Sequence, residues 1–137
     1  MISEEVRFCV YYEDVDCGGV VYHANYLKFM ERARAELLKN LGLSQLMMVD
    51  KFKIGLIVSD VVIKYLKPAK FEDELRVVST ISDMTMLKLT WKQEVYRNYE
   101  LEPITDATIT TVCVNHNLNP IRIPSQIFDK LSIEPVN

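Results

Sequence analysis

The chain has 137 residues, of which 49% are hydrophobic and 26% charged, and its formal net charge is −3. This composition is typical of a globular domain and excludes disordered and fibrous proteins, while the acidic balance lacks the basic stripe that nucleic-acid binding favours. The length predicts one domain over residues 1–137, large enough to bury its own core.

A strand and a helix are the first predicted elements. Near the N-terminus every second residue is apolar, which is the period of a strand with one buried face: Val6, Phe8, Val10 and Tyr12. Further on, apolar residues recur every three or four positions, as in an amphipathic helix: Tyr26, Met30, Ala33, Leu37 and Leu41. Gly42 can end this helix in a left-handed conformation, and Ser44 can cap a short second helix through Met48.

The rest of the chain is rich in predicted strands. Four segments, residues 56–66, 74–81, 86–96 and 106–115, are separated by short connections, which favour antiparallel neighbours. The third alternates most regularly, and only Gln93 interrupts its apolar face. A last helical turn is predicted after Pro124. The order β-α-β-β-β-β predicts an α+β fold in which one long helix packs against a five-stranded antiparallel sheet. One helix covers only part of such a sheet, which favours an oligomer.

The cysteines and the N-terminus predict a cytoplasmic protein with reduced thiols. Cys9, Cys17 and Cys113 are odd in number and lack CxxC spacing, so neither a disulfide framework nor a zinc cluster is indicated. The first residues carry acids where a signal peptide needs positive charge. No apolar run approaches the roughly 18 residues of a membrane span, so no integral membrane segment is expected.

The segment Glu13 to Asn25 holds the candidate functional residues. Its acids, Glu13, Asp14 and Asp16, suit hard cations, but an EF-hand needs a different pattern, because Asn25 stands where that loop requires glutamate. A looser magnesium site stays open. Cys17 and His23 form a second candidate, as nucleophile and base, although no third group that would orient them is identifiable and free cysteine commonly packs as a small hydrophobe.

A third interpretation assigns the chemistry to Asp16. Gly18 and Gly19 let a ligand approach the main chain closely, and the first amides of the following helix are unpaired and carry partial positive charge. Together they would supply a base or nucleophile and an oxyanion donor, as acyl transfer requires. Asp before a helix also serves as a simple cap or turn former.

The stretch "YYEDVDCGGVVYHANYLKFMERAR" closely resembles the signature of the hot-dog-fold acyl-CoA thioesterases of the 4-hydroxybenzoyl-CoA thioesterase class, in the YbgC-like branch associated with the Tol-Pal system. The later "VVIKYLKPAKFEDELRV" is similar to that family's second recurrent segment, and the match runs from about Val6 to Val114. The resemblance implies a hot-dog fold, homodimers or homotetramers with a continuous sheet, and hydrolysis of an acyl-CoA without metal or other cofactor. An acyl carrier protein is a second candidate carrier.

The resemblance also implies residue roles. Asp16 would be the catalytic carboxylate, either attacking the carbonyl or activating water, and the backbone amide of His23 would hold the oxyanion. The turn and pocket would come from Gly19, Tyr22, Asn25 and Tyr26, and the coenzyme A phosphates favour basic residues such as Lys67 and Lys70. Lys64 and Arg122 are further basic candidates. Two other functions stay open: a hot-dog hydratase or dehydratase that uses His23, and a non-catalytic acyl-binding protein.

Overall fold

Five strands and one long helix make up most of residues 2–132, the part of the chain that the computed structural model describes. The elements in chain order are β1 (Ser3–Cys9), η1 (Tyr12–Asp14), α1 (Asn25–Asn40), α2 (Gln45–Met47), η2 (Met48–Phe52), β2 (Ile54–Tyr65), β3 (Glu74–Met84), β4 (Lys88–Arg97), β5 (Thr105–Asn115) and α3 (Ser125–Leu131). The domain predicted over residues 1–137 extends past these limits, and residues 1 and 133–137 lie outside the described part.

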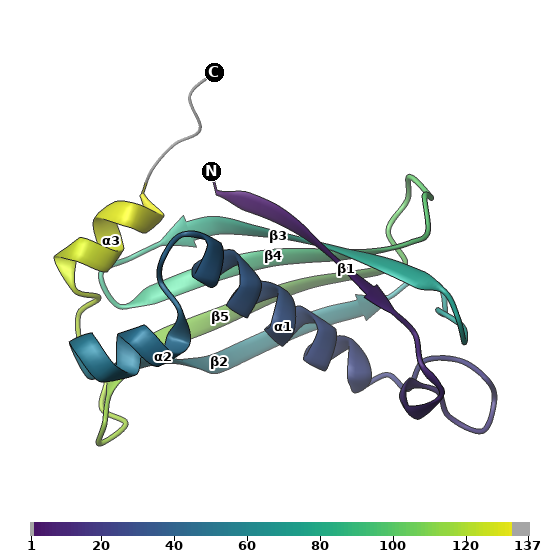
Figure 1. The fold of residues 1–137 in the computed structure, drawn as a ribbon, viewed down its shortest axis with the longest axis horizontal. Coiled ribbons are helices and arrows are strands. Elements are labelled where there is room, and N and C mark those ends of the chain that lie inside the picture. The colour runs from purple at the N-terminus through teal and green to yellow at the C-terminus, as the bar shows by residue number, and fades with distance from the viewer. Residues whose placement is uncertain (1, 133–137) are drawn as a thin grey trace.

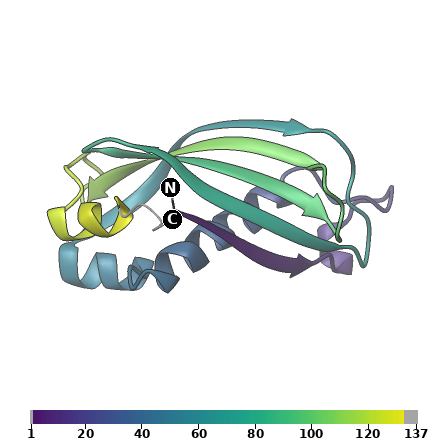
Figure 2. The same cartoon turned by 90° about the horizontal axis from the view of Figure 1, so that it is seen from above.

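The long helix lies along one face of a curved antiparallel sheet, so the fold has two layers (Figures 1 and 2). Helix α1 buries the apolar stripe that the sequence predicts, and Met30 and Ala33 are 0% exposed. Its end also follows the prediction: Gly42 takes φ +76°, and the Leu43 N–H donates to the Leu38 carbonyl at 2.8 Å. The predicted α+β fold, with one long helix on a five-stranded antiparallel sheet, is confirmed.

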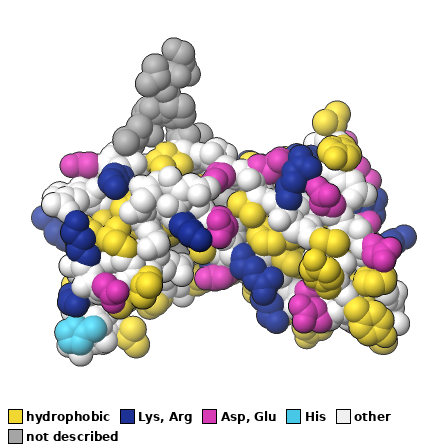
Figure 3. Space-filling view, in the orientation of Figure 1, with side chains coloured by type: hydrophobic (Ala, Val, Ile, Leu, Met, Phe, Trp, Pro, Cys, Tyr) yellow, Lys and Arg dark blue, Asp and Glu magenta, His cyan; other side chains and the backbone are white. Residues whose placement is uncertain are grey.

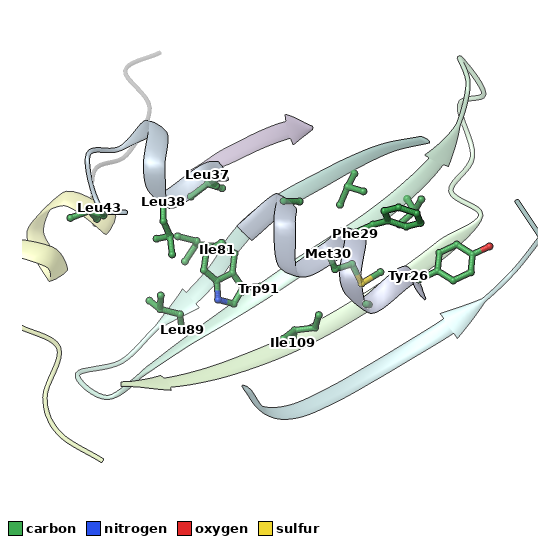
Figure 4. Close-up of a cluster of buried hydrophobic side chains, with 14 of the residues drawn as sticks. Tyr26, Phe29, Met30, Leu37, Leu38, Leu43, Ile81, Leu89, Trp91 and Ile109 are labelled. Atoms are coloured by element: carbon green, nitrogen blue, oxygen red, sulfur yellow. The ribbon is translucent and has the colours of Figure 1, made fainter. Parts of the chain in front are cut away.

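The core fills the space between α1 and the inner face of the sheet (Figure 4). Trp91 of β4 is completely buried there, and its indole N–H donates to the Thr111 hydroxyl at 3.0 Å. One polar network crosses this core. The Gln93 amide donates to the Met30 carbonyl at 2.9 Å and to the Ser79 hydroxyl at 2.8 Å, and its oxygen accepts from Arg34 at 2.9 Å. Gln93 therefore interrupts the apolar face because it pairs with a polar residue of the helix.

The strand order is β1-β3-β4-β5-β2, which places β1 and β2 at the two edges. Consecutive strands β3, β4 and β5 are antiparallel neighbours, as the short connections predict. The same expectation is wrong for β2 and β3, because β2 pairs with β5 and residues 66–73 carry the chain across to β3. That connection is held by the loop before α1: the Val10 N–H donates to the Asp73 carbonyl, and the Val21 N–H to the Ala69 carbonyl, each at 2.9 Å.

The first strand is shorter than predicted. It ends at Cys9, and the chain then turns through η1 instead of extending the strand to Tyr12. The cause is Asp14, which is buried and accepts the Tyr11 N–H through its carboxylate at 2.9 Å. This contact takes Tyr12 out of the sheet.

Edge strand β2 leaves apolar side chains exposed along its middle. Ile57, Val58, Val61 and Val62 are between 37% and 55% exposed. An exposed apolar edge strand is a template for pairing with another chain. The part of the sheet that one helix is expected to leave uncovered therefore includes this edge strand.

Candidate active site

Asp16 lies in a tight turn that the two glycines permit. Its carboxylate accepts the Gly18 N–H at 2.8 Å, and its carbonyl accepts the Gly19 N–H at 3.0 Å. Gly19 has φ +78°, a conformation that other residues rarely adopt, and a Cβ on Gly18 would lie 3.2 Å from the Asp16 carboxylate. The turn therefore fixes the direction of an exposed carboxylate and leaves the main chain beside it bare.

Asp16 lines a cavity of about 430 Å³ together with Tyr12, Val15, Cys17, Gly19 and Phe71. The rings of Tyr12 and Phe71 meet edge to face, with centroids 5.9 Å apart. Hydrophobic side chains gather at this end of the molecule, on the right of Figure 3. A mostly apolar hollow with one carboxylate suits an apolar group whose reacting atom must lie beside an acid.

The neighbouring acid, Asp14, has a structural role. It is 8% exposed, and its carbonyl accepts both the Tyr22 N–H at 2.9 Å and the Asn25 side-chain amide at 3.0 Å. Asn25 itself is 8% exposed. These bonds tie the turn to the start of the helix, so Asp16 is held at a set position relative to α1. Within residues 2–132 no group of three or more acids, histidines or cysteines is placed to hold a metal ion.

The start of α1 presents free amides. The Asn25 N–H donates to the Tyr22 carbonyl at 2.8 Å and the Leu27 N–H to the Ala24 carbonyl at 3.2 Å. Among the described residues, nothing accepts a hydrogen bond from the N–H of His23 or of Ala24. These donors stand at the positive end of the helix dipole, where they can stabilise a developing oxyanion.

The His23 side chain is outside the Asp16 cavity. Its exposed ring packs against Tyr22, with centroids 4.6 Å apart, and against Tyr65 at 6.2 Å. Cys17, by contrast, lines the cavity, so the structure does not bring these two side chains together as a nucleophile and base.

Tyr26 is a buried residue of the first turn of α1. It is 2% exposed, its hydroxyl accepts the Ala69 N–H at 3.1 Å, and burial raises its pKa. Its hydroxyl therefore connects the helix start to the segment that follows β2. Direct contact of Tyr22, Asn25 or Tyr26 with substrate stays a prediction.

The basic candidates are divided between two ends of the molecule. Lys67 and Lys70 are exposed in the segment beside the Asp16 turn, where Lys67 lies 4.0 Å from Glu102. Arg122 lines a separate cavity with Met86 and Phe128, near α3. The structure thus keeps Lys67 and Lys70 as phosphate candidates and sets Arg122 apart from them.

Three aromatic residues of this region were not singled out from the sequence. Tyr12 and Phe71 line the cavity, and the Tyr65 hydroxyl donates to the His23 carbonyl at 2.9 Å. The sequence alternation places Tyr12 in the first strand, whereas Tyr65 ends β2 and Phe71 follows it. The sequence feature that could have identified Tyr65 and Phe71 is the segment "KYLKPAKFED", which crosses from β2 to β3 beside the turn.

The fold and this site define a hot-dog protein that presents one carboxylate and a helix N-terminus at the same end. A family model described as the thioesterase-like superfamily matches residues 10–131, so the chain belongs to that superfamily. The acyl-CoA thioesterase YbgC of Haemophilus influenzae is 35% identical over 119 residues, which cover 86% of each chain. The predictions of a YbgC-like relative and of a thioesterase enzyme class are confirmed.

Solved structures agree with this placement. A probable thioesterase from Bartonella henselae superposes with a TM-score of 0.84 at 26% identity, covering 89% of this chain and 99% of the other. A 4-hydroxybenzoyl-CoA thioesterase mutant, in complex with 4-hydroxybenzoyl-CoA, reaches a TM-score of 0.89 at 17% identity, covering 96% and 100%. The second likeness shows the fold alone. Among residues 2–132, no helix has the length and apolar character that crossing a membrane requires.

Proposed function

We propose that this chain hydrolyses acyl-coenzyme A thioesters to a free acid and coenzyme A, with Asp16 as the reacting carboxylate and the His23 N–H as oxyanion donor. The observation that carries the proposal is the placement of a fixed, exposed carboxylate in an apolar cavity, tied through Asp14 to a helix start with free amides. The YbgC relatives, named as acyl-CoA thioesterases, support the substrate class.

The reaction needs one carboxylate and one oxyanion donor. Asp16 either attacks the thioester carbonyl, giving a mixed anhydride that water later hydrolyses, or removes a proton from the attacking water. In both routes the carbonyl oxygen becomes negative, the carbon–sulfur bond breaks, and coenzyme A leaves as a thiolate that takes up a proton. The His23 N–H and the helix dipole stabilise the negative oxygen.

The test is thiol release from a panel of short, long and aromatic acyl-CoAs. Asp16→Asn should lower kcat by at least ~10²-fold, the scale of one acid or base. Glu13→Gln is the matched control, because Glu13 is an exposed acid of η1, just before the Asp16 turn, and does not line the cavity. Equal rates for wild type and Asp16→Asn would refute the proposal.

Two further assays, enoyl-CoA hydration and thioester binding, separate the other two functions. A hydratase or dehydratase would need the His23 ring for proton transfer, and that ring packs outside the Asp16 cavity. Hydration of an enoyl-CoA that is lost in His23→Ala would support it. Binding of many thioesters without turnover would instead identify an acyl-binding protein.

Lys67 and Lys70 are proposed to hold the phosphates of coenzyme A, since both are exposed beside the Asp16 turn. The double variant Lys67→Ala/Lys70→Ala should raise KM for acyl-CoA and leave KM unchanged for the acyl-N-acetylcysteamine, which lacks the phosphates. An unchanged KM for acyl-CoA would refute this role. Acyl-loaded carrier protein in the same assay decides whether it is an alternative carrier.

The protein is proposed to assemble as a homodimer or homotetramer through β2, whose apolar side chains are exposed. Val62→Lys puts a charge on this edge, the usual means of blocking strand pairing. Sedimentation velocity should show an oligomer for wild type and a monomer for Val62→Lys; a monomeric wild type would refute the assembly.

A cytoplasmic location, tested by cell fractionation, would fit the exposed free thiols of Cys9 and Cys17.

A further inference from the structure

The carbonyl of His23 lies outside the hydrogen-bond ladder of α1. In a regular helix it would accept from Leu27, but the Leu27 N–H donates to the Ala24 carbonyl instead, at 3.2 Å. Among the described residues, the group that binds the His23 carbonyl is the Tyr65 hydroxyl, which donates to it at 2.9 Å. A side chain from the end of an edge strand thus holds a main-chain group at the catalytic end of the helix.

Tyr65 is itself well placed by its neighbours. Its ring packs against Tyr26, with centroids 5.5 Å apart, and against His23 at 6.2 Å. The residues after it are fixed to the helix start, because Ala69 accepts the Val21 N–H at 2.9 Å and donates its own N–H to the Tyr26 hydroxyl at 3.1 Å. The hydroxyl of Tyr65 is therefore a fixed point against which the His23 carbonyl is oriented.

The carbonyl of His23 and the N–H of Ala24 belong to one planar trans peptide, in which they point in opposite directions. Fixing the carbonyl therefore fixes the direction of the Ala24 N–H. Tyr22 to Asn25 form a turn closed by the Asn25 N–H to Tyr22 carbonyl bond of 2.8 Å, and Ala24 has φ −70° and ψ −21°. In such a helical turn successive N–H groups share a direction along the axis, and both His23 and Ala24 have free ones.

We propose that Tyr65 is a positioning residue of the oxyanion site, which orients the His23–Ala24 peptide so that the Ala24 N–H stands beside the His23 N–H as a second hydrogen-bond donor to the substrate. This inference rests on the proposed thioesterase function. It extends the site from one amide to two and gives β2 a part in catalysis, although Tyr65 itself touches no reacting atom.

The first experiment compares Tyr65→Phe with wild type. The variant keeps the ring contacts and removes one hydroxyl, so kcat should fall about tenfold, the upper range for one hydrogen bond. KM should change by less than about twofold, because the ground-state carbonyl needs the donors less than the oxyanion does. The melting temperature should stay within about 2 °C, since an exposed hydrogen bond contributes little to stability.

Tyr96→Phe is the matched control. It removes a tyrosine hydroxyl with one hydrogen bond, to Glu94 at 3.1 Å, from the end of a different strand. Its kcat should equal that of wild type. A wild-type kcat for Tyr65→Phe, or an equal loss in both variants, would overturn the inference.

The second experiment removes the donor itself. An L-lactic acid residue in place of Ala24 replaces the N–H by an ester oxygen and keeps the side chain. Its kcat should fall at least tenfold, and adding Tyr65→Phe should cause little further loss, because both changes act on one peptide. Full activity of the ester variant, or losses that multiply, would overturn the proposed role. If instead Asp16→Asn leaves wild-type activity unchanged, the thioesterase proposal fails first and independently of Tyr65.

Discussion

Replacing Gln93 by leucine should be among the most destabilising single changes in this protein. Gln93 is 0% exposed and makes hydrogen bonds to Arg34, Met30 and Ser79. Arg34 is 7% exposed, and burial lowers its pKa. In residues 2–132 no carboxylate lies within ion-pair distance of Arg34, so the Gln93 oxygen is its buried acceptor.

The size of the effect follows from what Gln93→Leu leaves behind. The charged hydrogen bond contributes about 1.5–3 kcal/mol and each neutral one about 1 kcal/mol, and the stranded guanidinium adds to this loss. We expect a loss of about 3–5 kcal/mol of unfolding free energy, similar to breaking a buried ion pair. Urea unfolding at fixed protein concentration measures it, with the exposed Gln126→Leu as the matched control.

A second substitution separates hydrogen bonding from packing. Arg34→Met combined with Gln93→Leu removes both polar partners, and replacing a buried polar pair by apolar groups is often nearly neutral. The double variant should therefore be more stable than Gln93→Leu alone by about 2 kcal/mol or more. A cost below about 1 kcal/mol for Gln93→Leu, or additive losses in the double variant, would refute the role of this pair.

Two further predictions concern the site end of the molecule. Gly19→Ala should cost about 1–2 kcal/mol of unfolding free energy, because Gly19 takes φ +78° although open space surrounds it. Gly55→Ala should cost less, because Gly55 also lies in open space but has no positive φ. Urea unfolding compares the two variants, and equal costs would contradict the strain argument. Burial raises the pKa of Tyr26 above 10.0, so its contribution to stability is complete below pH 10 and is lost as pH rises further, because the unfolded state releases the proton first. Unfolding free energy should therefore fall as the pH rises above 10, by up to about 1.4 kcal/mol per pH unit from this group, and Tyr26→Phe should show a shallower slope. Identical slopes would refute the assignment.

The helix and the strands were predictable because each carries a periodic apolar face. Tyr26, Met30 and Leu37 recur at helical spacing, and all three lie in the core (Figure 4). The alternation of β4 identifies Gln93 as an interruption but gives no sign of its partner Arg34, because the pairing depends on how the helix lies across β4. Sequence periodicity identifies a buried face without saying which residue of the next layer lies opposite.

The strand order could not be predicted from connection lengths. The eight residues from Leu66 to Asp73 are only one more than the seven that join the paired strands β4 and β5, yet they carry the chain from the β2 edge to β3. The crossing is stabilised by main-chain hydrogen bonds to Val10 and Val21. Backbone contacts of this kind depend little on side-chain identity, so they leave no pattern in the sequence.

That crossing also explains why the candidate site was only partly visible. Asp16 and Gly19 are only three positions apart in sequence, so a local turn is enough to bring them to one cavity. Phe71 and Tyr65 reach the same end only because residues 65–71 cross beside the loop before α1, where Ala69 bonds to both Val21 and Tyr26. The proposed reacting acid, Asp16, can therefore be recognised from its own turn, whereas Phe71 and Tyr65 reach the same end through the order of strands in the sheet.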